Sequence, residues 1–189
     1  MITTIPLESE SFYHIYNRGN NSEIIFREES NYLYFLILLK KYIVPVADIF
    51  AYCLLNNHFH LLIKVKEEEK IIARVEKSFS NLFNAYAKAF NKRFGRTGKL
   101  FEERFKRKKV EDEYYLTELI YYIHSNPQKH GLLKDFRDYP HSSFNSILSN
   151  KSTSLRREEV IDWFGGLSFY EEYHEKKYDQ LTSDKEFED

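Results

Sequence analysis

The spacing of hydrophobic residues along this chain divides it into segments with two different periods. Short runs rich in aromatic and β-branched residues, bounded by turn residues, predict strands at 12–17, 48–55, 57–65 and 100–110. Apolar residues at helical spacing predict helices at 28–43, 68–94, 112–125 and 157–164. Pro45 ends the first of these helices and Pro127 closes the third.

These segments follow the order β-α-β-β-α-β, with a further helix after the last strand. The order predicts an α+β domain with a ferredoxin-like antiparallel sheet. The two crossover helices are expected to cover one face of the sheet, which leaves the other face for the additional helix or a ligand. Residues 1–148 form this domain, and residues 149–178 form an extension that contains the short helix. Residues 179–189 form an acidic tail that we expect to be disordered.

Composition narrows the class of protein and its partners. A length of 189 residues allows one ordinary hydrophobic core, and a net charge of −1 excludes a simple polycation. This balance hides a basic stretch at 88–109, with ten Lys or Arg against two Glu, and an acidic stretch at 171–189, with eight acids against three Lys. Cys53 stands alone, so we expect a reducing cytoplasm and no disulfide framework. We also expect no secretory signal and no membrane span.

The most specific chemical feature is His58-Phe59-His60 within an apolar strand. Because side chains alternate along a strand, His58 and His60 point to one face, whereas Phe59 and Leu61 point to the other. Imidazole is the commonest metal ligand in proteins, so two imidazoles on one face form half of a metal site. A His-x-His pair in an arbitrary strand is more often structural, and a second group of residues must support this interpretation.

The helix at 112–125 and the residue that follows it provide this second group. On a helical wheel, its Leu and Ile residues form a stripe that faces the core, and Tyr122 lies on the flank of the stripe. Asn126, four residues on, lies about 40° from Tyr122. Tyr121 is predicted to point away from the stripe, toward solvent. The wheel therefore favours Tyr122 as the tyrosine that shares a site with Asn126, although a residue before Pro127 could simply end the helix.

Together these side chains could hold an exchangeable metal ion. His58 and His60 offer two nitrogens and Asn126 offers an amide oxygen, which leaves coordination positions open, as a catalytic metal requires. Because the set has no carboxylate or thiolate, Mg²⁺ or Mn²⁺ fits it better than a structural Zn²⁺. Such a metal could polarise a phosphate oxygen beside Tyr122, whose phenol is a poor nucleophile at neutral pH without help.

The motifs resemble those of the one-tyrosine HUH (His-hydrophobic-His) transposases, especially the branch of REP-associated tyrosine transposases. The resemblance covers residues 12–145, in the segments YHIYNRG (13–19), AYCLLNNHFHLL (51–62), GKLFEERFK (98–106), YIHSNP (122–127) and DYPHSS (138–143). It implies His58, His60 and Asn126 as metal ligands and Tyr122 as the nucleophile. It also implies a single-stranded DNA substrate, often near a hairpin. The tyrosine attacks a backbone phosphate, which forms a 5′-phosphotyrosine link and frees a 3′-hydroxyl.

Basic side chains supply candidate contacts with the DNA backbone. Arg104, Lys106 and Lys108 alternate along the fourth predicted strand and could follow phosphates, which adds affinity without sequence information. Arg18 could contact DNA or close a turn. The predicted DNA-binding residues are Arg18, Lys99, Arg104, Lys106, Arg107 and Lys108.

Three functions stay open at this point. The leading hypothesis is a metal-dependent transposase, a monomer or a homodimer, that nicks and rejoins single-stranded DNA through Tyr122. The alternative is a domesticated relative that binds DNA or RNA hairpins without cutting them. The third is a metal-dependent phosphodiesterase that uses water in place of the tyrosine.

Overall fold

Four antiparallel strands form one sheet at the centre of the protein. The structure, a computed structural model, describes residues 5–67 and 71–186. The strands are β1 (Phe12–Arg18), β2 (Ala47–Leu54), β3 (His58–Val65) and β4 (Lys106–Val110), in the spatial order β2-β3-β1-β4. Tyr16 on β1 lies opposite His60 on one side and opposite Lys106 on the other. This arrangement confirms the predicted ferredoxin-like α+β fold.

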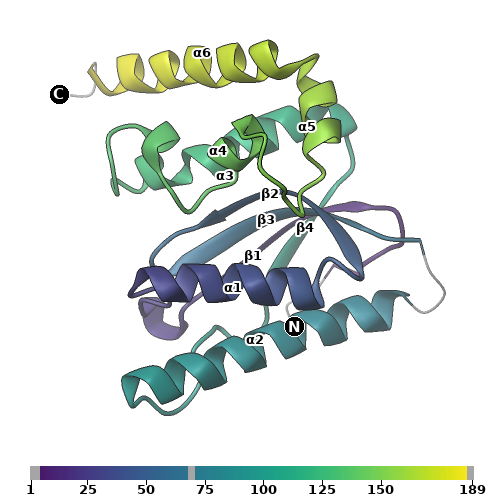
Figure 1. The fold of residues 1–189 in the computed structure, drawn as a ribbon, viewed down its shortest axis with the longest axis vertical. Helices are drawn as coiled ribbons and strands as arrows, with labels where there is room; N and C mark the ends of the chain where they lie inside the picture. Colours follow the sequence, from purple (N-terminus) through teal and green to yellow (C-terminus); the bar gives the residue numbers. More distant parts are fainter. Residues whose placement is uncertain (1–4, 68–70, 187–189) are drawn as a thin grey trace.

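Two helices cover one face of the sheet (Figure 1). They are α1 (Glu29–Tyr42) and α2 (Ile71–Phe94), which contact each other. Alternate residues of the central strands, among them Ile15, Phe59 and Leu61, are fully buried in the core beneath these helices. Because side chains alternate along each strand, the residues between them face the opposite side of the sheet.

The remaining helices lie on that opposite side (Figure 1). They are α3 (Leu116–Lys129), α4 (Phe144–Leu148), α5 (Arg157–Phe164) and α6 (Leu167–Glu186). Short 3-10 turns occur at Asn20–Ser22, which follows β1, at Glu113–Tyr115 and at Phe136–Asp138. α3 contacts β2 and β3, and Tyr170 and His174 of α6 are buried against it in a second core. Among the described residues, no helix is both long and apolar enough to cross a bilayer.

Several predicted boundaries differ from the structure. β4 begins at Lys106 instead of residue 100, because Leu100 and Phe101 turn into the core beside α2. α3 continues past Pro127 to Lys129, since a proline in the last turn removes only one helical hydrogen bond. The expected disorder after residue 178 is wrong for 179–186, which continue α6. Residues 187–189 of the expected tail, and 68–70 of the second predicted helix, lie outside the described residues.

Candidate active site

Strand alternation brings three histidines to the sheet face that carries α3. His58 and His60 lie on β3, and His14 lies on the neighbouring β1. The His60 ring stacks on that of His14 with centroids 5.1 Å apart, and the centroids of His58 and His60 are 5.2 Å apart. Phe59, between the two β3 histidines, is fully buried in the core under α1 and α2. The pair therefore shares one face, as the period of the strand predicts.

Each histidine of the β3 pair already has one ring nitrogen engaged. The Nδ1 of His58 lies 2.7 Å from the side-chain oxygen of Asn57, which can only accept a hydrogen bond. The Nδ1 of His60 lies 2.9 Å from the Nε2 of His14. In metal sites, a hydrogen bond of this kind on one nitrogen fixes the tautomer and orients the other nitrogen as the ligand. Nε2 is therefore the nitrogen through which both His58 and His60 could bind a metal.

Burial keeps these three imidazoles neutral at physiological pH. Loss of hydration disfavours the charged form and lowers the pKa of His58 and of His14 to about 4. Burial also lowers the pKa of His60, to which the neighbouring His14 and His58 contribute. The neutral form is the one that coordinates a metal ion.

α3 brings Tyr122 to the same place. The centroid of its ring lies 5.9 Å from that of His60 and 5.9 Å from that of His14. Tyr122 lines a cavity of about 290 Å³ together with His58 and His60, and it is 37% exposed. The structure thus brings the candidate nucleophile and the histidine pair together in one solvent-accessible pocket.

Tyr121 is buried, and the prediction that it points to solvent is wrong. It is 6% exposed, and its Oη donates a hydrogen bond to the carbonyl of Lys177 on α6, at 3.1 Å. The helical wheel accounted only for the face that α3 turns to the sheet, whereas α6 gives α3 a second buried face. The accessible tyrosine of the pair is Tyr122.

Asn126 is not among the residues that line this cavity. It is 2% exposed, and its Nδ2 donates to the carbonyl of Tyr122 at 2.6 Å. His130, just beyond the end of α3, lines the cavity instead, with its ring centroid 4.8 Å from that of His58. Within residues 5–67 and 71–186, no three His, Cys, Asp or Glu side chains are grouped so as to hold a metal ion. His130 therefore does not complete a histidine triad with His58 and His60.

Sequence reasoning missed two residues at this site, His130 and Lys129. The Nζ of Lys129 lies 4.6 Å from the ring centroid of Tyr122, and burial lowers the pKa of Lys129. Its ammonium group places a positive charge beside the phenol, where charge would develop on deprotonation. The signal for His130 was its place four residues after Asn126, but it was overlooked because the helix was predicted to end at Ser125.

Two of the predicted DNA-binding residues lie at the cavity and one beside it. Arg18 and Lys106 line the cavity and both contact the carboxylate of Glu102, Lys106 at 3.8 Å. Lys108 lines an adjoining cavity of about 510 Å³, which shares the walls formed by His60 and Tyr122. These three cations therefore lie around the cavities that Tyr122 lines.

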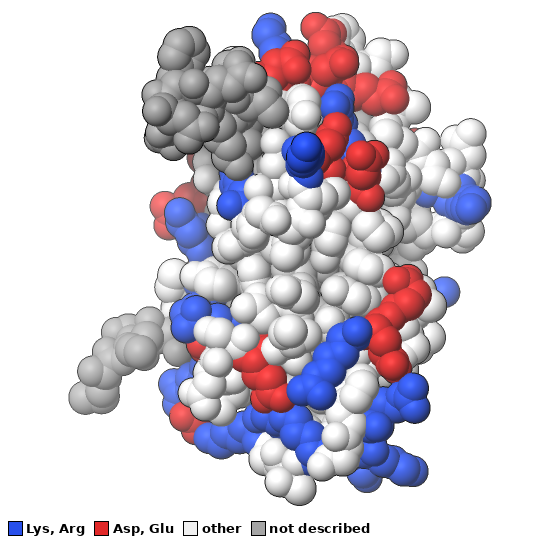
Figure 2. All heavy atoms as spheres, turned by 90° about the vertical axis from the view of Figure 1, so that its left-hand side faces the viewer, with Lys and Arg blue, Asp and Glu red and all other residues white. Residues whose placement is uncertain are grey.

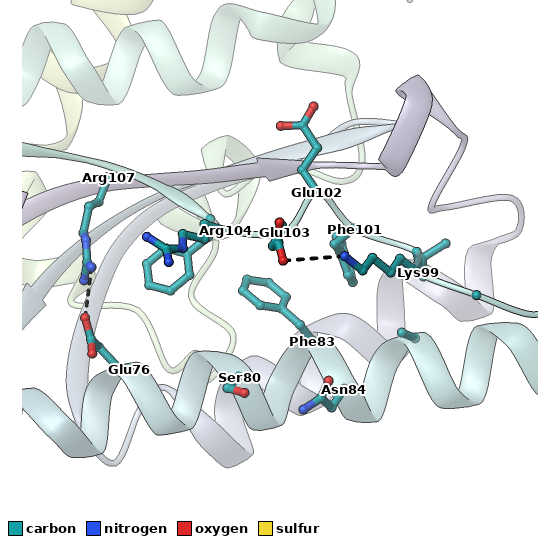
Figure 3. A pocket seen from close by; sticks show the side chains of 14 residues that line it. Glu76, Ser80, Phe83, Asn84, Lys99, Phe101, Glu102, Glu103, Arg104 and Arg107 are labelled. Carbon is teal, nitrogen blue, oxygen red and sulfur yellow. Dashed lines mark hydrogen bonds and ion pairs between the residues drawn. The ribbon is translucent and has the colours of Figure 1, made fainter. Parts of the chain in front are cut away.

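The other three predicted DNA-binding residues, Lys99, Arg104 and Arg107, line a separate groove against α2 (Figure 3). The predicted row of Arg104, Lys106 and Lys108 is therefore divided, because Arg104 lies before β4 begins. On the face shown in Figure 2, Lys and Arg gather at the lower end, where α2 lies, and an acidic group occupies the upper end, where α6 lies. The basic residues around α2 and the acidic residues of α6 thus lie at opposite ends of the molecule.

Comparison with known proteins agrees with this geometry. Residues 9–126 match the family model described as "Transposase IS200 like". The fold is similar to a solved structure of a REP-associated tyrosine transposase bound to a REP hairpin, with a TM-score of 0.57 and 16% sequence identity. That match covers 79% of this chain and 87% of the solved chain. A search of curated protein sequences finds no match.

Proposed function

The chain belongs to the family of IS200-like transposases, and from this premise we propose that it nicks and rejoins single-stranded DNA through Tyr122. The observation that carries the proposal is the shared cavity of Tyr122, His58 and His60. A phenol and a pair of neutral imidazoles in one pocket are the groups that a metal-assisted tyrosine nucleophile requires.

The two β3 histidines fit a divalent metal ion. His58 and His60 would hold it through their Nε2 atoms, because hydrogen bonds engage both Nδ1 atoms. Asn126 stays the predicted third ligand, through its amide oxygen, and Mg²⁺ or Mn²⁺ stays the predicted metal. When bound, the ion would supply Lewis-acid polarisation of a phosphate oxygen.

The protein's own residues would then position the reacting groups. Arg18 and Lys106 hold the phosphate at the cavity. The Oη of Tyr122 gives its proton to water as it forms a bond to phosphorus. The bond from phosphorus to the 3′-oxygen breaks, and the 3′-oxygen takes up a proton from water. The products are a 5′-phosphotyrosine and a free 3′-hydroxyl, and the reverse reaction rejoins the strand. The ammonium group of Lys129 stabilises the negative charge that Tyr122 carries during the attack.

We propose a single strand that carries a hairpin as the substrate. The solved structure with a similar fold is a transposase bound to a REP hairpin. The basic residues at the cavity supply sequence-independent affinity for such a strand.

The test is a covalent adduct between the protein and a stem–loop oligonucleotide from the DNA that flanks the gene. With Mn²⁺, the wild type should give a denaturation-resistant adduct that Tyr122→Phe lacks. Tyr114→Phe is the matched control and should retain the adduct, because Tyr114 is 94% exposed and lines neither cavity at Tyr122. Hairpin binding without any adduct would support the non-cutting alternative. Cleavage by Tyr122→Phe would support a phosphodiesterase that uses water.

A further inference from the structure

A groove of about 860 Å³ separates α2 from residues 98–105 (Figure 3). The wall on α2 is one helical stripe, formed by Glu76, Ser80, Phe83, Asn84 and Ala87. Apart from Phe83, its side chains are small or polar and leave the space between the two walls unfilled. Residues 98–105 belong to a motif that the resemblance singles out, yet most of them lie outside the cavity of Tyr122 and the β3 histidines.

The side chain of Arg107 closes one end of this groove and has unused hydrogen-bond donors. It is 8% exposed, and its Nη2 lies 2.9 Å from a carboxylate oxygen of Glu76. Within the described part of the chain, its Nε and Nη1 are buried and have no hydrogen-bond partner. These two nitrogens carry three N–H groups, and buried donors without an acceptor are costly and rare in folded proteins. A ligand in the groove would supply the missing acceptor once the guanidinium turns toward it.

The groove offers aromatic surface and three cations, Lys99, Arg104 and Arg107, whose charge is balanced by the carboxylates of Glu76, Glu102 and Glu103. The ring centroids of Phe83 and Phe101 are 5.0 Å apart, those of Phe83 and Phe105 are 5.9 Å apart, and the guanidinium of Arg107 lies 5.2 Å from the ring centroid of Phe105. Figure 3 shows Arg104 beside these rings, and Arg104 is exposed. Aromatic faces next to arginines are the combination that holds an unpaired base and its phosphate.

The groove and the candidate active site share one wall residue. Glu102 lines both the groove and the cavity of Tyr122, and its carboxylate contacts Arg18 and Lys106 on the active-site side. A strand bound at the cavity would reach the groove by passing Glu102.

We propose that this groove binds an unpaired nucleotide of the DNA strand that Tyr122 attacks. Phosphate oxygens accept hydrogen bonds from Arg107 and Arg104, and the base stacks on the phenylalanine rings. This inference rests on the proposed function, because the strand is the proposed substrate. The groove would thereby fix which phosphate of the strand reaches Tyr122.

Photocrosslinking locates the strand directly. The probe is a stem–loop oligonucleotide with an unpaired thymidine tail on each side, in which 5-iodouracil replaces thymine, bound to full-length Tyr122→Phe so that it stays uncut. After irradiation, crosslinked peptides that contain Phe83 or residues 98–105 are the expected result. If the tail nucleotides crosslink only to peptides outside Phe83 and residues 98–105, the proposal is overturned.

Affinity measurements test the contacts. We expect Arg104→Gln and Arg107→Gln to weaken binding of the tailed hairpin about tenfold and to leave the untailed hairpin unaffected. Each variant should also reduce, by about one, the slope of the logarithm of the binding constant against the logarithm of the salt concentration, because one phosphate contact is lost. Lys151→Gln, an exposed lysine between α4 and α5, is the matched control. Because Arg107 is buried and its loss could affect folding, Arg104→Gln provides the decisive comparison.

The adduct assay separates this inference from the proposed function. The wild type could form the adduct while every groove variant binds the tailed hairpin as tightly as the wild type does. This result would overturn nucleotide binding in the groove and leave the proposed function intact. Crosslinks in the groove without any adduct would support the groove as a nucleotide site, whereas the cutting function would fail.

Discussion

His14 offers a test of metal binding that removes none of the proposed ligands. If His60 binds a metal through Nε2, its proton resides on Nδ1 and is donated to the Nε2 of His14, 2.9 Å away. His14→Phe removes this acceptor but keeps an aromatic ring of similar size, which can still stack on His60 as the imidazole does at 5.1 Å. The N–H of His60 then has no acceptor in a site where it is only 6% exposed.

The size of the effect follows from this burial. Loss of a hydrogen bond that orients a metal-binding histidine typically lowers metal affinity by about 10- to 100-fold, which corresponds to about 1.4–2.7 kcal/mol. Water can replace the lost acceptor only poorly at a site so little exposed, so we expect the upper half of this range. His14→Gln should recover most of the affinity, because the amide oxygen of Gln can accept the same hydrogen bond.

Calorimetric titration of the DNA-free protein with Mn²⁺ measures this affinity directly. His141→Phe is the control, since His141 stacks on Tyr32, with ring centroids 3.5 Å apart, and does not line the cavity. Thermal unfolding of each metal-free variant shows whether the fold is retained. If folded His14→Phe binds Mn²⁺ as tightly as the wild type does, His60 is not oriented by His14, and the reasoning about its tautomer fails.

Three further predictions follow from the structure. Asn126→Ala should weaken Mn²⁺ binding about tenfold and more than His130→Phe does, because His130 forms no histidine triad; the opposite order in the same titration would make His130 the third ligand. Burial lowers the pKa of His174 to about 4, whereas in the unfolded chain the pKa is about 6.5. Between these two pH values only the unfolded chain binds a proton at this residue. The free energy of unfolding should therefore fall by up to about 3 kcal/mol as the pH is lowered from 6.5 to 4. In urea unfolding, His174→Gln should therefore show a shallower loss of stability between pH 6.5 and 4, and an unchanged slope would contradict this assignment. Phe59→Ala, at a fully buried position between the aromatic rings of the first core, should lower the free energy of unfolding by about 3–5 kcal/mol, and a loss below 1 kcal/mol would show that the core closes around the gap.

Local sequence patterns predicted those parts of the structure that depend on residues close together in the chain. The alternation around Phe59 placed His58 and His60 on one face without any knowledge of the rest of the fold. The helical spacing from residue 71 to 94 and the order of the elements predicted the ferredoxin-like sheet and the side of it on which α1 and α2 pack. The position of Tyr122 on the flank of its helix followed from the same kind of reasoning.

The predictions that were wrong depend on segments distant in the sequence. Tyr121 is buried because α6 packs on α3, and a helical wheel for one helix cannot show a second partner. Leu100 and Phe101 leave the strand because the core under α2 has room for them. Arg107 faces α2 whereas Lys106 and Lys108 face α3, so the basic stretch serves two different sites, and a count of charges could not separate them.

The C-terminal extension has a part in the site although it supplies none of the proposed catalytic groups. Its α6 meets α3 through buried hydrogen bonds: the Nδ1 of His124 lies 3.1 Å from the Nε2 of His174, and Tyr121 bonds the carbonyl of Lys177. On its other side, α3 is held by Ile120 and Ile123, which are fully buried in the core against the sheet. A helix fixed on two faces cannot turn about its axis, so the direction in which Tyr122 leaves α3 is set by both contacts together. Tyr122 therefore lies beside His60, whereas Tyr121 lies against α6.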